Sequence, residues 1–341
     1  MVAKIEIRVS RRLAARYPHG AMKRFSHPFL ASGSKNGRRL ILLAFGLIMF
    51  SVALANPLSA QEVALTFDDL PAHSTLPPNL SRVDIAKMII GDLQSAHAPK
   101  TYGFVNAGKL ENVPADIEVL KMWRAAGFPL GSHTYSHMSL TANSAEAFEQ
   151  DIRKNEPVLE SLMAGNDWHW FRYPFLWEGD TFEKRRAIRA YLAANGYRVA
   201  QVTLDFEDYA WNAPYARCVA KNDAVAIERL KATYMSTAGE YIRLGQTMSE
   251  LIYGRDIKHV LLLHLGGFET VMLPQLLAYL NGRGFSLITL EDAESDPAYQ
   301  SDPNVVSKWG GTLLEQMMDA THLKIPPHAE KPFKELDSVC R

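Results

Sequence analysis

The stretch EVALTFDDLP, residues 62–71, determines how the fold begins. Val63, Leu65 and Phe67 alternate with smaller residues, and the run ends at two acids and a proline. An apolar run with this two-residue period, bounded by turn-forming residues, is typical of a buried β-strand. We therefore predict a strand that stops at Asp68 and presents carboxylates at its end.

Strands and helices are predicted to alternate along the rest of the chain. This alternation favours a parallel α/β architecture. About seven such units, with polar residues at the strand ends, fit a (β/α) barrel with its active site at the strand C-terminal ends, although a doubly wound sheet gives the same local pattern. Further strands are predicted at 101–107, 128–133, 169–175, 197–206, 259–267 and 285–290, and helices at 115–127, 144–163, 181–196, 221–254 and 270–284.

The composition excludes some classes of protein. The 341 residues include 37 Lys and Arg against 37 Asp and Glu, so the net charge gives no case for nucleic-acid binding. A hydrophobic content of 47% is ample for a buried core. The chain has two cysteines, Cys218 and Cys340, which rules out a four-cysteine zinc site and leaves open whether they form a disulfide.

The N-terminal segment, residues 1–60, has the pattern of an export signal. Residues 1–40 are strongly basic, and an uninterrupted apolar run follows from Leu40 to Ala55. The run is shorter than the roughly 20 residues of a membrane span, so we expect a signal peptide cleaved near Ala55 or Ala60. The protein would then be periplasmic or secreted. An uncleaved anchor, the only expected membrane contact, is the alternative, and Met22 is an alternative start.

Reactive side chains fall where the predicted strands end. In a parallel barrel these ends meet at one rim, so residues distant in sequence can share a site. Taken singly, paired acids are most often helix caps, and a histidine on an apolar strand is most often a core residue. The residues at these ends are Asp68, Asp69, His133, His137, Arg172, Asp205, Asp208 and His264.

Three of these residues form a candidate metal site. Two imidazoles and a carboxylate, from His133, His137 and Asp69, give three ligands and leave a fourth position for water, as in catalytic zinc sites. Thr134 follows His133, which excludes the H-E-x-x-H pattern of metalloproteases. The neighbouring Asp68 could take a proton from water, and a histidine from the far side of the rim could protonate a leaving group. Such a set suits hydrolysis of an amide or ester.

Five ordered motifs between Val63 and Leu290 give the chain a family resemblance. They are TFDD at 66–69, HTYSH at 133–137, RYPF at 172–175, DFEDY at 205–209 and LLLH at 261–264. In this order they resemble the polysaccharide deacetylases of the NodB homology domain, carbohydrate esterase family four. The resemblance implies a distorted (β/α) barrel over 61–293 that removes N- or O-linked acetyl groups from a carbohydrate.

The resemblance also implies a divalent metal, most readily Zn²⁺, with Co²⁺, Ni²⁺ or Mn²⁺ as alternatives. The metal would be held by the three residues named above. Asp68 would be the catalytic base, oriented by Arg172, and His264 the general acid. Phe175 would give its backbone N–H to the oxyanion. A carboxylate of the fourth motif would tune the acid, and of Asp205 and Asp208 we prefer Asp208.

The sequence departs from the family pattern in ways that bear on the substrate. Leu70 stands where Gly is usual and Tyr209 where Trp is common, and the stretch 211–258 reads as an insertion that could wall the groove. The same fold could therefore act on a small amide, an ester or a lipid-linked sugar, or bind carbohydrate without catalysis. Residues 294–341 are Pro-rich, and we expect a loose C-terminal extension. The aromatic candidates for stacking on sugars are Trp168, Trp170, Trp177 and Trp211.

Overall fold

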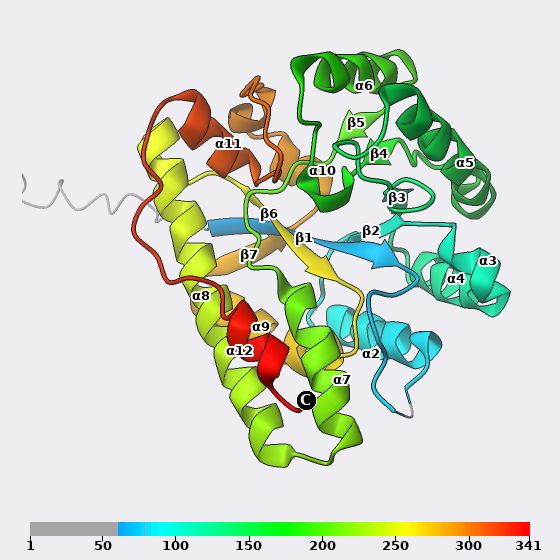
Figure 1. The fold of residues 1–341 in the computed structure, drawn as a ribbon, viewed down its shortest axis with the longest axis vertical. Coiled ribbons are helices and arrows are strands. Elements are labelled where there is room, and N and C mark those ends of the chain that lie inside the picture. The colour runs from blue at the N-terminus through cyan, green and yellow to red at the C-terminus, as the bar shows by residue number, and fades with distance from the viewer. Residues whose placement is uncertain (1–60, 79) are drawn as a thin grey trace, which may run out of the picture. The chain divides into compact units, whose positions relative to one another are not determined.

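The computed structural model describes residues 61–78 and 80–341 and contains a parallel sheet surrounded by helices (Figure 1). The predicted export signal, its cleavage site and the alternative start fall within residues 1–60, outside the described ranges. The seven strands are β1 (Gln61–Leu70), β2 (Tyr102–Val105), β3 (Leu130–Ser132), β4 (Trp170–Phe171), β5 (Arg198–Val199), β6 (His259–His264) and β7 (Phe285–Ile288).

The sheet curls into a distorted barrel. Its strand order is β5-β4-β3-β2-β1-β6, with every pairing parallel, and β7 pairs with the first half of β1. Beyond β5, Leu204 forms a parallel bridge with Leu261 of β6, which joins the two ends of this order. The predicted parallel barrel of about seven strands is therefore confirmed, and all strand C-terminal ends lie on the same side.

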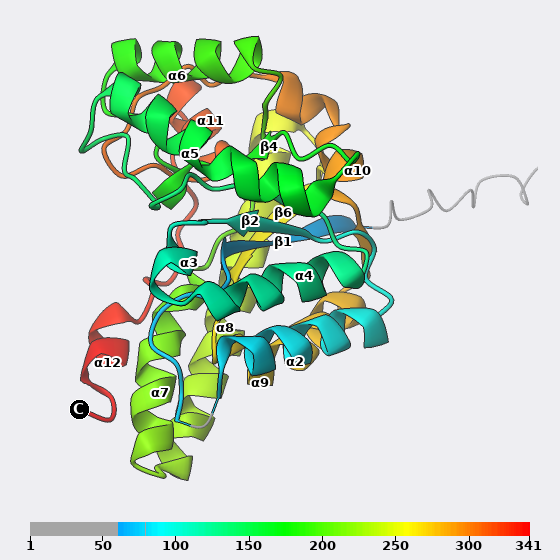
Figure 2. The same cartoon turned by 90° about the vertical axis from the view of Figure 1, so that its right-hand side faces the viewer.

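Helices cover the outside of this sheet. In Figure 2, α2, α4 and α9 lie beneath β1 and β2, while α5 and α6 lie on the opposite side. The predicted helix over 144–163 is confirmed as α5, which begins after Ser144, whose hydroxyl accepts from the Ala147 N–H. The helices are α2 (Arg82–Ser95), α3 (Lys109–Asn112), α4 (Ile117–Ala125), α5 (Ala145–Met163), α6 (Phe182–Ala194), α7 (Asn212–Ala220), α8 (Ala224–Tyr253), α9 (Glu269–Gly282), α10 (Leu290–Glu294), α11 (Leu313–Ala320) and α12 (Phe333–Ser338).

The alternation in β1 separates two kinds of environment. Val63, Leu65 and Phe67 belong to the main apolar core, together with residues of α2, α4 and α9. Successive side chains of a strand point to opposite faces. Thr66, which lies between Leu65 and Phe67, and Asp68, which follows Phe67, therefore point the other way, into the barrel, where both are buried. The period seen in the sequence thus places a carboxylate inside the barrel.

The predicted strand over 197–206 is wrong in extent. Its regular part is limited to Arg198–Val199, and Leu204 makes an isolated bridge. The reason is that other groups take the backbone acceptors between them: the Ala200 carbonyl accepts from the Arg172 side chain, and the Val202 carbonyl accepts from the Leu313 N–H. The segment has the β-branched, apolar pattern that is typical of a strand, but it does not continue the ladder.

The C-terminal extension is packed, so the expectation that it is loose is also wrong. Leu314 and Met318 of α11 are buried in a cluster with Leu244 and Met248 of α8. Near the end of the chain, the Arg217 side chain donates to the backbone carbonyls of Leu336, Asp337 and Val339. None of the helices in the described ranges has the length and apolar composition needed to cross a membrane.

A disulfide between Cys218 and Cys340 fixes the last residues to α7 and settles the question that the sequence left open. Because it closes a loop of 122 residues, breaking it increases the conformational freedom of the unfolded chain. We expect Cys340→Ser to lower the free energy of unfolding by about 2–4 kcal/mol, measured by urea denaturation. A reductant should destabilise the wild type equally and leave the variant unchanged. Equal stability of both oxidised proteins would contradict this account.

Candidate active site

The end of β1 directs two adjacent carboxylates toward one cavity. In a regular strand, Asp68 and Asp69 would point to opposite faces. Here the pairing of β1 with β2 shifts register between Phe67 and Leu70, and Asp69 has a φ of 68°. Irregularities of this kind re-aim side chains beside active sites. As a result, both carboxylates line the same cavity.

The two histidines lie in the loop that follows β3. Thr134 and His137 have φ values of 61° and 58°, in the left-handed region that non-glycine residues seldom adopt. The buried Asn106 side chain holds the loop by donating to the carbonyls of His133 and Thr134. This strained loop turns the two imidazoles toward each other, with ring centroids 4.9 Å apart.

Asp69, His133 and His137 come together as a possible cation site. Each offers one ligand atom, and these atoms all lie within 4.8 Å of one another. His133 Nδ1 is 2.8 Å from the Arg172 carbonyl oxygen, so it carries the proton and donates, which leaves Nε2 free as a ligand. Such a second contact orients histidine ligands in metal sites. The donor set and its spacing fit a divalent cation such as zinc.

The protonation of these residues agrees with that reading. Burial lowers the pKa of His133 to about 3 and that of His137 to about 4, so both imidazoles are neutral near pH 7. Burial alone would raise the pKa of Asp69, but the ammonium group of Lys109 opposes it, and this pKa lies below its usual range. Metal ligands must be deprotonated, and here all three are.

Sequence reasoning missed two residues beside Asp69. Lys109 Nζ lies 3.1 Å from Asp69 Oδ1 and also donates to the Asp69 carbonyl. His73 Nε2 lies 3.6 Å from the other carboxylate oxygen, and its ring faces His264 at a centroid distance of 5.1 Å. Both follow predicted strand ends, the signal that identified their neighbours, and could have been found in the same way.

Asp68 is held by a buried arginine. Arg172 Nη1 lies 3.1 and 3.3 Å from the two oxygens of Asp68, while Nη2 donates to Thr66 and Nε donates to the Ala200 carbonyl. Burial raises the pKa of Asp68, and the arginine opposes that rise. The guanidinium fixes the carboxylate in one orientation, with Oδ2 3.6 Å from His133 Nε2.

On the other side of β1, His264 pairs with Asp208. The two are joined by an Nδ1 to Oδ1 contact of 2.7 Å, and the His264 backbone N–H donates to Oδ2. Burial alone would lower the pKa of His264, but Asp208 outweighs it and raises this pKa to about 9. The imidazole is therefore protonated at neutral pH and can give up a proton from Nε2. Asp205 instead accepts from the Glu207 N–H, so the structure places Asp208, the preferred candidate, against the histidine.

The turn Pro174–Leu176 lies next to the three possible ligands. Phe175 and Leu176 have φ values of 60° and 57°. The Phe175 ring packs edge-on against His137 with centroids 4.4 Å apart, which brings the backbone of this turn close to the candidate cation site. Strained backbone of this kind is often found where catalysis needs a fixed geometry.

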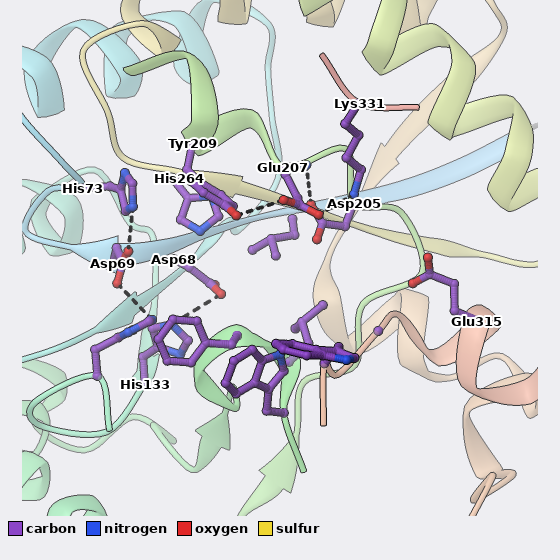
Figure 3. A pocket seen from close by; sticks show the side chains of 17 residues that line it. Asp68, Asp69, His73, His133, Asp205, Glu207, Tyr209, His264, Glu315 and Lys331 are labelled. Carbon is purple, nitrogen blue, oxygen red and sulfur yellow. Dashed lines mark hydrogen bonds and ion pairs between the residues drawn. The ribbon is translucent and has the colours of Figure 1, made fainter. Parts of the chain in front are cut away.

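A cavity of about 380 Å³ joins these groups, with Asp69 and His133 at one end and Glu315 and Lys331 at the other (Figure 3). Arg172 and Asp208 do not line the cavity. They contact Asp68 and His264, which do. The expectation that 211–258 walls the groove is wrong, because none of those residues lines the cavity. The C-terminal extension does so instead. The lining residues are Asp68, Asp69, His73, His133, His137, Phe175, Leu176, Trp177, Asp205, Glu207, Tyr209, Leu262, His264, Trp309, Gly311, Glu315 and Lys331.

Two of the aromatic candidates for sugar binding belong to the core. Trp170 and Trp211 are buried, and Trp168 is half-buried against apolar clusters. Of the four candidates, only Trp177 lines the cavity. Trp309, which the sequence did not single out, lines it as well.

The strand ends of this parallel barrel bring together an Asp-His-His set, an aspartate bound by an arginine and a histidine paired with an aspartate. Residues 55–200 match the family model of polysaccharide deacetylases. This segment is therefore similar to polysaccharide deacetylases, and the resemblance seen in the motifs is confirmed. The match ends before the segments that supply Asp208 and His264.

Two curated relatives are named as deacetylases of chitin and of peptidoglycan. The chain is 28% identical over 152 residues to a chitin deacetylase of Arthroderma benhamiae, covering 45% of this chain and 36% of that protein. It is 25% identical over 173 residues to a peptidoglycan-N-acetylglucosamine deacetylase of Bacillus cereus, covering 51% and 54%. The chain thus matches about half or less of each relative. The solved chitin deacetylase of Colletotrichum lindemuthianum superposes with a TM-score of 0.45 at 20% identity, covering 68% of this chain and 88% of that one.

Proposed function

We propose that the protein is a metal-dependent hydrolase that removes acetyl groups from an N- or O-acetylated glycan. The observation that carries the proposal is the cavity in which the Asp-His-His set, Asp68 and His264 converge. Held by Asp69, His133 and His137, a divalent cation would polarise the acetyl carbonyl and make water more acidic. The names of the relatives support an acetylated carbohydrate as the substrate.

The side chains supply the proton transfers. Asp68, fixed by Arg172, takes a proton from the attacking water while the water oxygen bonds to the acetyl carbon. The Phe175 backbone N–H would donate to the oxygen that becomes negatively charged. His264 donates its proton to the leaving nitrogen or oxygen as the bond to the acetyl carbon breaks. The products are acetate and the free amine or hydroxyl.

Export is part of the same proposal. The basic segment followed by the apolar run Leu40–Ala55 supports secretion or passage to the periplasm. The Cys218–Cys340 disulfide agrees, because such bonds persist in oxidising compartments. An extracellular or cell-wall glycan would then be within reach.

The test is acetate release from a panel of acetylated oligosaccharides and small acyl amides, before and after chelation. We expect stoichiometric metal in the purified protein and about a 100-fold fall in rate on chelation, restored by adding Zn²⁺, Co²⁺, Ni²⁺ or Mn²⁺. His133→Ala should lose the metal but still unfold in a single cooperative thermal transition, which shows that the variant is folded. An exposed histidine with no place in the cavity, changed as His322→Ala, is the matched control.

The outcomes separate the alternatives. If the protein hydrolyses small amides but no oligosaccharide, the substrate is a small molecule and not a glycan. A protein without metal that binds sugars and releases no acetate would be a non-catalytic carbohydrate-binding protein, and the proposal would be abandoned.

A further inference from the structure

Trp309 leaves most of its indole in water at the edge of the cavity. Its exposed fraction is 80%, whereas the other tryptophan of the cavity, Trp177, is half-buried. Removing a large aromatic ring from water is favourable. An exposed ring at the mouth of a pocket therefore suggests a surface that a ligand covers.

A row of aromatic rings connects Trp309 with the candidate cation site. Phe175 packs against His137, Trp177 lies 4.8 Å from Phe175 between centroids, and Trp309 packs edge-on against Trp177 at 6.2 Å. The row leads from a ligand of the site to the outer edge of the cavity. A chain of sugar rings whose acetyl group reaches the ligands can follow the same direction.

The loop that carries Trp309 is held in place although its indole is exposed. Gly310 has a φ of 67° and packs so closely on the Phe175–Trp177 turn that an added Cβ would lie 2.3 Å from the Trp177 ring. Directly after it, the Leu313 N–H donates to the Val202 carbonyl, and Thr312 and Glu315 form a capping box at the start of α11. A preorganised loop loses little conformational entropy when a ligand binds.

The far end of the cavity offers polar partners. Figure 3 shows Glu207, Lys331 and Glu315 around this end. Lys331 Nζ is 2.6 Å from Glu207 Oε1, and its side chain is largely buried. An aromatic face with a few fixed polar groups matches a sugar ring, which has an apolar C–H face and hydroxyls at its rim.

We propose that Trp309, supported by Trp177, is a specificity-determining residue that stacks on the sugar ring next to the one that loses its acetyl group. The preferred substrate is then an acetylated oligosaccharide of at least two rings, and a monosaccharide fills the cavity only in part. This inference rests on the proposed function, because it names the substrate class of the same site.

The test compares Trp309→Ala and Trp309→Phe with the wild type on N-acetylglucosamine and on its pentamer. For Trp309→Ala we expect KM for the pentamer to rise about tenfold with kcat little changed, the size expected from losing one aromatic contact. The rate with the monosaccharide should change by less than about twofold. Trp309→Phe keeps an aromatic face and should recover most of the KM.

Phe182→Ala, at an exposed aromatic residue of α6 outside the cavity, is the matched control and should leave both substrates unaffected. Equal losses on monosaccharide and pentamer would show a structural role and overturn the inference, as would an unchanged KM for the pentamer. If the wild type releases acetate neither from these two substrates nor from any member of the acetylated panel, the proposed function fails, and calorimetric titration with the pentamer still tests Trp309. Tight binding by the wild type with about tenfold weaker binding by Trp309→Ala would support the subsite, and equal affinities would refute it.

Discussion

Replacing Asp68 by Asn is expected to lower kcat for acetate release by about 10³-fold, the usual size of a general-base contribution. The amide has nearly the same shape as the carboxylate and can still accept a hydrogen bond from Arg172, but it cannot take a proton from water. Asp68 is buried at the end of β1 beside the Asp-His-His set, and no other carboxylate combines this position with a guanidinium contact among the described residues. The metal content should remain at the wild-type level, because Asp68 is not one of the three ligands.

The control for this variant is Asp319→Asn, at an exposed aspartate of α11, which should keep full activity. The measurement is single-turnover acetate release at saturating substrate, with metal analysis of the same samples. If Asp68→Asn keeps more than about a tenth of the wild-type rate, the general base lies elsewhere, and His73, which also contacts Asp69, is the next residue to test.

The repeating parts of the structure could be predicted because they follow a regular period. The alternation in 63–67 gave both the strand and the burial of its two faces, and the positions after the strand ends gave the candidate ligands. The disposition of Asp68 and Asp69 could not be read in this way. Two consecutive strand residues reach the same cavity only because the ladder shifts register and Asp69 takes a positive φ.

The wall of the cavity was beyond sequence reasoning for a different reason. Residues 294–341 show little periodicity, and their position depends on contacts with distant parts of the chain: α11 with α8, and Cys340 with Cys218. The segment 211–258 has the stronger helical pattern, yet none of its residues lines the cavity. Thus Trp309 enters the site through tertiary contacts that no local pattern indicates.

Arg172→Met is expected to lower the free energy of unfolding by about 3–5 kcal/mol, since it leaves a buried carboxylate without its partner. The guanidinium is fully buried and contacts both oxygens of Asp68, the Thr66 hydroxyl and the Ala200 carbonyl. Activity should fall with stability, because the carboxylate loses the contact that orients it. The measurement is urea denaturation of the purified variant together with acetate release.

A double variant tests whether the buried pair is the cause. Adding Asp68→Asn to Arg172→Met removes the unpaired charge, so the double variant should be more stable than Arg172→Met by about 1–3 kcal/mol while staying inactive. Arg229→Met is the matched control: its partner Glu335 lies 2.6 Å away on the surface, and losing an exposed pair of this kind costs less than about 1 kcal/mol. Strictly additive losses in the double variant would show that Arg172 stabilises the barrel through Thr66 and Ala200 rather than through Asp68. The arginine would then be a structural residue of the barrel interior and not the residue that holds the base.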